Sequence, residues 1–242
     1  MLDGGRRGGS SMGIPMLLHI RDVLKPDQIA ECRRMIDRAE WVDGRRTANF
    51  AEFSDVKNNQ EVSQTDPAAL QMGTMILAAL SNNGLFVQRA LPIKICPPLF
   101  NRYTGGENYA THTDSGLLQQ RPPNLPLRSD LSATLFLTAP ADYDGGELVI
   151  EDNFGRHSIK LPAGDMIVYP ASSLHHVEPV TRGARVSSFF WIQSAIRSDA
   201  QRMLLTELQS SIDHMRQAVP GNPGIMELMG VYSNLLRLWS ET

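Results

Sequence analysis

A histidine and an aspartate lie two residues apart in the stretch NRYTGGENYATHTDSG, residues 101–116: His112 and Asp114, with Thr113 between them. The stretch ends a run with β-strand character, and side chains at positions i and i+2 of a strand point to the same side. An imidazole and a carboxylate on one face can both bind a divalent metal ion. The alternative is that this short triplet occurs by chance and is a solvated loop end.

A third ligand could come from YPASSLHHVEPV, residues 169–180, which contains His175 and His176. Neighbouring strand residues face opposite sides of a sheet, so we expect only one of the two to face the metal. The spacing to an arginine further along favours His175. Two histidines and one carboxylate form the facial triad of non-haem Fe(II) oxygenases, which leaves coordination positions open.

A co-substrate at those open positions needs an anchor, and Arg185 suits that role in TRGARVSSFFW, residues 181–191. A guanidinium keeps its charge and pairs with both oxygens of a carboxylate. We expect a tight turn at Arg182, after which Arg185 could reach the far end of a chelated five-carbon dicarboxylate. Ser187 would share the Arg185 face and add a hydroxyl, while Arg182 would be a solvated turn charge.

The segments that must position these residues differ in predicted secondary structure: a β-rich region is flanked on both sides by helices. From about residue 95 to 194, short β-rich segments separated by turn signals predict an antiparallel sandwich or barrel. Helical periodicity precedes this region in residues 25–41 and 65–84, the second with a stop at Gly84. Two more helical stretches, residues 199–217 and 224–239, predict a hairpin packed on the β domain or on a second subunit.

Composition narrows the function classes. The chain has 242 residues, 42% of them hydrophobic, with a formal net charge of -3, which gives no global reason to expect a nucleic-acid partner. The two cysteines, Cys32 and Cys96, lie outside any C-x-x-C pattern, so a disulfide scaffold is not expected and a reducing cytoplasm fits. The apolar runs are too short for a membrane span. Residues 1–15 have the composition of a disordered leader; the alternative is an over-extended start, with Met16 as the true beginning.

At His112, Asp114, His175 and Arg185 the chain resembles the Fe(II)/2-oxoglutarate-dependent oxygenases. Further segments resemble the PKHD-type hydroxylases, a prolyl-4-hydroxylase-like group that includes PiuC-like iron-uptake-associated proteins. The resemblance runs from residue 16 to the C-terminus and is carried by VKNNQEV, PLFNRY, SDLSATLFL, YDGGELVI, LPAGDMIVYP, SLHHVEPVTRGARVSSFFWIQS and NLLRLWSE.

This resemblance implies an α+β protein with a double-stranded β-helix (jelly-roll) core, N-terminal supporting helices and a C-terminal helical hairpin. The expected boundaries are a leader over residues 1–15, a dioxygenase domain over 16–196 with its β core at about 95–194, and a helical extension over 197–242.

The resemblance also implies the site. His112, Asp114 and His175 would bind Fe(2+), and Arg185, Ser187 and Tyr103 would bind 2-oxoglutarate, with no catalytic residue beyond the metal centre. L-ascorbate would keep the iron ferrous. Many relatives carry a tyrosine on the strand that here reads ATLFL, where Phe136 stands, so Thr134 or Ser187 would have to replace its hydroxyl. Tyr103 and Tyr109 are either core aromatics or phenol donors to 2-oxoglutarate.

The expected activity is hydroxylation of a small molecule or peptide, coupled to oxidative decarboxylation of 2-oxoglutarate and linked to iron uptake. Asp114 favours hydroxylation over halogenation, because related halogenases lack this ligand. The alternative is a non-catalytic barrel that senses iron or 2-oxoglutarate. We expect no nucleic-acid or membrane partner and a cytoplasmic location. The C-terminal helices are the expected surface for a homo-oligomer, unless they fold onto their own barrel. The loop over residues 115–129 would border the substrate mouth.

Overall fold

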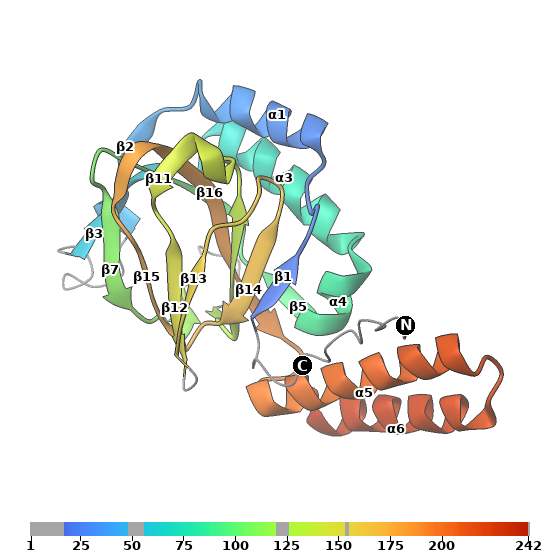
Figure 1. The fold of residues 1–242 in the computed structure, drawn as a ribbon. Helices are drawn as coiled ribbons and strands as arrows, with labels where there is room; N and C mark the ends of the chain where they lie inside the picture. Colours follow the sequence, from blue (N-terminus) through green and yellow to red (C-terminus); the bar gives the residue numbers. More distant parts are fainter. Residues whose placement is uncertain (1–16, 48–55, 120–125, 153–154, 242) are drawn as a thin grey trace, which may run out of the picture.

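Among the described residues, two antiparallel sheets, a short two-stranded ribbon and covering helices make up the fold (Figure 1). The computed structural model describes residues 17–47, 56–119, 126–152 and 155–241. The predicted leader, residues 1–15, lies outside this described part. The mixed helix and sheet content agrees with the predicted α+β class.

The larger sheet has the strand order β1-β14-β10-β16-β6-β4-β2, and β5 and β11 also pair with β16. Its strands are β1 (Leu18–Ile20), β2 (Trp41–Asp43), β4 (Gln60–Val62), β5 (Pro92–Ile95), β6 (Leu99–Thr104), β10 (Leu131–Phe136), β11 (Tyr143–Gly145), β14 (Met166–Pro170) and β16 (Val180–Ser194).

The smaller sheet has the order β13-β12-β15-β7-β3, and a separate two-stranded ribbon pairs β8 with β9. The strands of the smaller sheet are β3 (Lys57–Asn58), β7 (Asn108–His112), β12 (Leu148–Asp152), β13 (Gly155–Ile159) and β15 (Leu174–Val177). The ribbon consists of β8 (Leu117–Leu118) and β9 (Leu127–Arg128).

The helices are α1 (Pro26–Ile36), α3 (Pro67–Ser81), α4 (Gly84–Ala90), α5 (Asp199–Ala218) and α6 (Pro223–Trp239), with short 3-10 turns at Gly44–Thr47 and Pro140–Asp142. The sequence predicted one helix ending at Gly84. Instead α3 ends at Ser81 and α4 begins at Gly84, because the Asn83 side chain accepts a hydrogen bond from the Phe86 backbone and starts a new helix.

Both faces of the larger sheet are buried, and each face packs into a different hydrophobic core. On β10, Leu131, Ala133 and Leu135 pack against the helices of the main core, while the alternating Phe136 belongs to a second core between the sheets. In Figure 1, α1, α3 and α4 cover one side of this sheet and the smaller sheet lies on the other. Polar side chains on the inner face are therefore held between two sheets.

The predicted turn at Arg182 is wrong, because β16 runs without interruption from Val180 to Ser194. The chain turns earlier, between the end of β15 and Val180. Gly183 has a φ of 70° and pairs with Tyr143 of β11, where an added Cβ would lie 2.1 Å from the carbonyl oxygen of Asp142. A glycine is required at this close approach, and that requirement explains the Arg-Gly signal inside a strand.

The C-terminal helices α5 and α6 form the predicted hairpin, which lies beside α4 at one end of the molecule (Figure 1). Arg89 of α4 joins the hairpin to the rest of the chain by donating to the Thr206 carbonyl at 2.6 Å and to the Ser210 hydroxyl at 2.7 Å. The hairpin thus packs on its own chain. None of the helices in the described residues is long and apolar enough to cross a membrane.

Candidate metal centre

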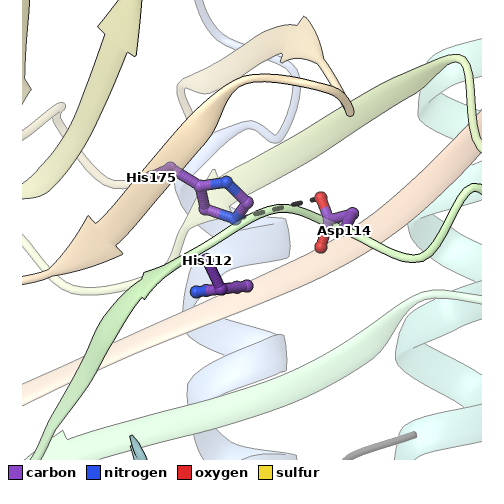
Figure 2. A group of neighbouring side chains, drawn as sticks. All are labelled: His112, Asp114 and His175. Atoms are coloured by element: carbon purple, nitrogen blue, oxygen red, sulfur yellow. Dashed lines mark ion pairs between the residues drawn. The ribbon is translucent and has the colours of Figure 1, made fainter. Parts of the chain in front are cut away.

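His112, Asp114 and His175 meet between the two sheets. Each offers one ligand atom, and these atoms all lie within 4.8 Å of one another. Figure 2 shows the three side chains converging from two segments, with His175 Nε2 lying 3.8 Å from Asp114 Oδ2. Strand pairing explains the meeting, because His112 is the direct cross-strand partner of His175 on β7 and β15.

Hydrogen bonds hold Asp114 just beyond the end of β7. Its backbone N–H donates to the Ala171 carbonyl at 3.3 Å, which ties it to the segment that leads into β15. The Ser132 hydroxyl on β10 donates to Asp114 Oδ2. The carboxylate is therefore oriented by both sheets.

Both imidazoles are oriented by a hydrogen bond to the backbone carbonyl two residues earlier in the chain. The Nδ1 of His112 lies 2.8 Å from the Ala110 carbonyl, and the Nδ1 of His175 lies 3.0 Å from the Ser173 carbonyl. A carbonyl can only accept, so each Nδ1 carries a hydrogen, which leaves Nε2 as the atom through which a neutral ring could bind a metal. Burial, together with the neighbouring His175, lowers the pKa of His112 to about 4. The neutral imidazole, which is the form that binds metal, is thus favoured.

The rival His176 faces the opposite way from His175. Its Nε2 lies 3.1 Å from Glu178 Oε1, and its Nδ1 lies 3.4 Å from the Thr111 hydroxyl. The structure places it outside the group of converging side chains. The expected alternation of the two histidines is therefore observed.

A β-bulge in β7 adds an aromatic ring to the site. His175 pairs with His112 but Val177 pairs with Tyr109, so two steps on β15 correspond to three on β7. The extra residue turns Tyr109 to the same side as His112. The two rings stack with centroids 3.7 Å apart. Tyr109 thus packs on the imidazole, an arrangement that strict strand alternation does not predict.

Arg185 is 1% exposed, which is unusual for a charged side chain. It donates to the Ser187 hydroxyl at 2.8 Å, which in turn donates to Asn101 Oδ1 at 2.6 Å. Its guanidinium also lies 5.2 Å from the ring centroid of Phe136. Within the described part of the chain no carboxylate forms an ion pair with Arg185, and its Nε has no hydrogen-bond partner. A buried cation in this state favours an anionic ligand.

Tyr103 is buried next to Arg185, with its ring centroid 5.4 Å from the guanidinium carbon. Its hydroxyl oxygen accepts from the Asn59 side-chain amide at 3.1 Å, so its own hydrogen can be donated elsewhere. Burial raises the pKa of Tyr103 to about 12, and the phenol stays protonated. Thr134 also lines the cavity, and its side chain forms a hydrogen bond with Tyr169.

One cavity of about 100 Å³ connects these groups, well above the ~10–15 Å³ that a water molecule needs. Its walls include the three converging side chains as well as Arg185, Ser187 and Tyr103. Phe189 and Trp191, which share the face of Arg185 on β16, add an aromatic pair with centroids 5.6 Å apart.

Three residues of the segment VKNNQEV, residues 56–62, were not predicted from the sequence to belong to the site. Lys57, Asn59 and Glu61 all line the cavity. They stand at alternate positions of an extended segment, and this spacing on one face was the signal that could have identified them.

Two family models match the chain. Residues 98–193 match the model described as 2OG-Fe(II) oxygenase superfamily, and residues 199–241 match the PKHD-type hydroxylase C-terminal domain. The first match contains every residue predicted for the metal and the co-substrate.

Curated relatives cover nearly the whole chain. A PKHD-type hydroxylase of Methylobacillus flagellatus is 52% identical over 228 residues, which is 94% of this chain and 100% of the relative. Another, from Burkholderia ambifaria, is 52% identical over 229 residues with the same coverage.

Among solved structures, a prolyl hydroxylase of Trichoplax adhaerens in complex with a hypoxia inducible factor peptide fragment superposes with a TM-score of 0.53. The match covers 79% of this chain and 87% of that chain. At 14% identity this likeness concerns the fold alone.

Proposed function

The chain belongs to the PKHD-type hydroxylases within the 2OG-Fe(II) oxygenase superfamily, and we propose that His112, Asp114 and His175 hold the Fe(II) of this dioxygenase. The observation that carries the proposal is the convergence of their ligand atoms within 4.8 Å, in a cavity that also contains a buried arginine.

The donor set fits the metal. Two neutral imidazole nitrogens and one carboxylate oxygen are the ligand set of non-haem Fe(II) oxygenases, which leaves other coordination positions for co-substrate and O₂. When bound, Fe(II) with 2-oxoglutarate supplies the oxidising power for hydroxylation. The protein fixes the ligands: two backbone carbonyls orient the imidazoles, and Ser132 orients the carboxylate.

Arg185 is proposed to hold the carboxylate at the far end of 2-oxoglutarate. Support comes from its burial, from its lack of a carboxylate partner among the described residues, and from its place in the same cavity wall. Ser187 contacts the guanidinium and would bind beside it, while Tyr103 would donate its free hydroxyl hydrogen to a co-substrate oxygen. Phe136 provides packing against Arg185 in place of a further hydroxyl.

Several finer assignments belong to this proposal. We assign the two-sheet core to the double-stranded β-helix, with an oxygenase domain over residues 16–196, a helical extension over 197–242 and a leader over 1–15. L-ascorbate as the reductant and a link to iron uptake depend on the family resemblance alone. A cytoplasmic location is consistent with the two buried free cysteines. The substrate is proposed to be a small molecule or a peptide.

An anaerobic titration tests the proposal. Fe(II) and then 2-oxoglutarate are added to the purified protein, and the charge-transfer absorption of the ternary complex is followed. O₂ and labelled 2-oxoglutarate are then added, and labelled succinate is measured. We expect the absorption band and succinate release. Tight iron binding without succinate under any condition would instead support an iron sensor.

A further inference from the structure

An ion pair is buried in the cavity wall away from the proposed metal ligands. Lys57 Nζ lies 2.6 Å from Glu61 Oε1, and the two side chains are 7% and 4% exposed. Both line the cavity. Burying two charges costs several kcal/mol per ion by desolvation, and apolar residues in such positions are often equally or more stabilising. Stability alone therefore does not explain this pair.

The pair lies beside the proposed metal centre. Lys57 on β3 is the direct cross-strand partner of Tyr109 on β7, and its Nζ lies 5.6 Å from the Tyr109 ring centroid. That ring stacks directly on His112. Glu61 on β4 is the partner of Asn101 on β6, which accepts from Ser187. The ion pair thus spans the edge where the two sheets meet, between the metal side and the Arg185 side.

The charges in the cavity limit what can bind there. If the proposed function holds, the formal charges of Fe(II), 2-oxoglutarate, Asp114 and Arg185 sum to zero. Lys57 and Glu61 also cancel. A charged substrate group placed in this cavity would lose water without gaining a counter-charge. The portion of the substrate that enters is therefore uncharged, with the partly exposed Phe189 and Trp191 offering an apolar wall.

The ion pair can still form hydrogen bonds with a neutral ligand, because it presents a hydrogen-bond donor next to an acceptor. An ammonium has three N–H donors and a carboxylate about four acceptor sites, so each can bond a ligand while the pair stays intact. A primary carboxamide or a cyclic amide offers the matching pattern, with a carbonyl oxygen and an N–H on the same side. An open-chain trans peptide bond directs these two groups apart.

Building on the proposed function, we propose that Lys57 and Glu61 select substrates that carry a primary carboxamide or a lactam. The Lys57 ammonium donates to the carbonyl oxygen of this group, and the Glu61 carboxylate accepts from its N–H. The pair recognises and orients the substrate and takes no part in the oxidation itself.

Matched probes test the proposal on the full-length holoenzyme. One set is N-acetylglutamine methylamide, N-acetylglutamate methylamide and N-acetylmethionine methylamide; the other is caprolactam and caprolactone. The readouts are the change in the anaerobic Fe(II)–2-oxoglutarate absorption band and the stimulation of succinate release. We expect the carboxamide and the lactam to bind about tenfold more tightly than their matched partners, since one or two hydrogen bonds separate them.

Variants separate recognition from structural support. Lys57→Met and Glu61→Gln should keep the absorption band while losing the preference for carboxamide over its partners. Arg156→Met with Glu151→Gln removes a surface ion pair of 2.9 Å on the smaller sheet and should keep the preference. Loss of the preference in this control as well would mean that the effect is structural and would overturn the assignment.

The outcomes distinguish the two proposals. Absence of the absorption band in the unmodified protein would contradict the proposed function. A normal band combined with equal binding of all probes, with no response to any probe, or with preference for the carboxylate would contradict the role of Lys57 and Glu61 alone.

Discussion

At the scale of single residues, the buried guanidinium of Arg185 is the group whose removal should separate co-substrate binding from metal binding. It has no carboxylate partner in the described part of the chain, so 2-oxoglutarate would supply its counter-charge. Arg185→Ala should weaken 2-oxoglutarate binding by about 2–5 kcal/mol and leave Fe(II) binding nearly unchanged.

The measurement is a 2-oxoglutarate titration of the absorption band at saturating Fe(II). Arg182→Ala is the matched control, because this arginine on the same strand is 57% exposed and pairs with Asp144 at the surface. Unchanged 2-oxoglutarate affinity in the Arg185 variant would show that another group is the anchor.

The adjacent histidines give a second prediction at the residue scale. His175→Ala should abolish Fe(II) binding, because it removes one of three ligands, whereas His176→Ala should preserve it, because that ring contacts Glu178 and Thr111 instead. Isothermal titration with Fe(II) under anaerobic conditions measures both. Similar losses in the two variants would contradict the ligand assignment.

At the scale of elements, pairing between β11 and β16 requires a glycine where the two strands approach most closely. Gly183→Ala would adopt a left-handed φ of 70° and bring its Cβ 2.1 Å from the Asp142 carbonyl oxygen. We expect the free energy of unfolding to fall by more than about 1 kcal/mol.

Urea denaturation measures this change, and α6 offers the control. Gly230 is in the helix, and a Cβ added there meets no atom within 4 Å. Gly230→Ala should raise the free energy of unfolding by about 0.5–1 kcal/mol, because alanine is the better helix former. Destabilisation by Gly230→Ala equal to that of Gly183→Ala would contradict the steric explanation.

At the scale of the whole molecule, Arg202 fixes the segment through which the C-terminal hairpin leaves β16. It is 1% exposed at the start of α5, and it donates to the carbonyls of Ile196 and Arg197, in the segment between β16 and α5, and to the Asp199 carboxylate. Burial lowers its pKa to about 10, so it remains charged at neutral pH. The hairpin therefore depends on a cation inside the junction.

Arg202→Ala should lower the free energy of unfolding by roughly 3 kcal/mol, because it leaves a cavity and unpaired carbonyls. Arg237→Ala on exposed α6 should change it by less than about 0.5 kcal/mol. Thermal unfolding measures both, and equal small effects would show that the hairpin docks without this contact. Self-association through the hairpin stays a prediction, which sedimentation of the full-length protein can test.

The sequence by itself determined the kinds of element and the side chains that alternate within them. Strand periodicity separated His175 from His176 and put Arg185 on the same face as Ser187, Phe189 and Trp191. These features are local, because they depend on backbone geometry over a few residues. The helical hairpin followed from the spacing of its apolar residues in the same way. Strand periodicity does not account for Asp114, which lies just beyond the end of β7 and is held by hydrogen bonds to Ala171 and Ser132.

Only the tertiary structure decided which strands pair and with what register. The bulge that turns Tyr109 onto His112, the path of β16 through Gly183, and the Lys57–Glu61 pair all depend on contacts between segments distant in sequence. The physical reason is that a one-residue change in pairing moves a side chain to the other face of a sheet, and no local pattern specifies that choice.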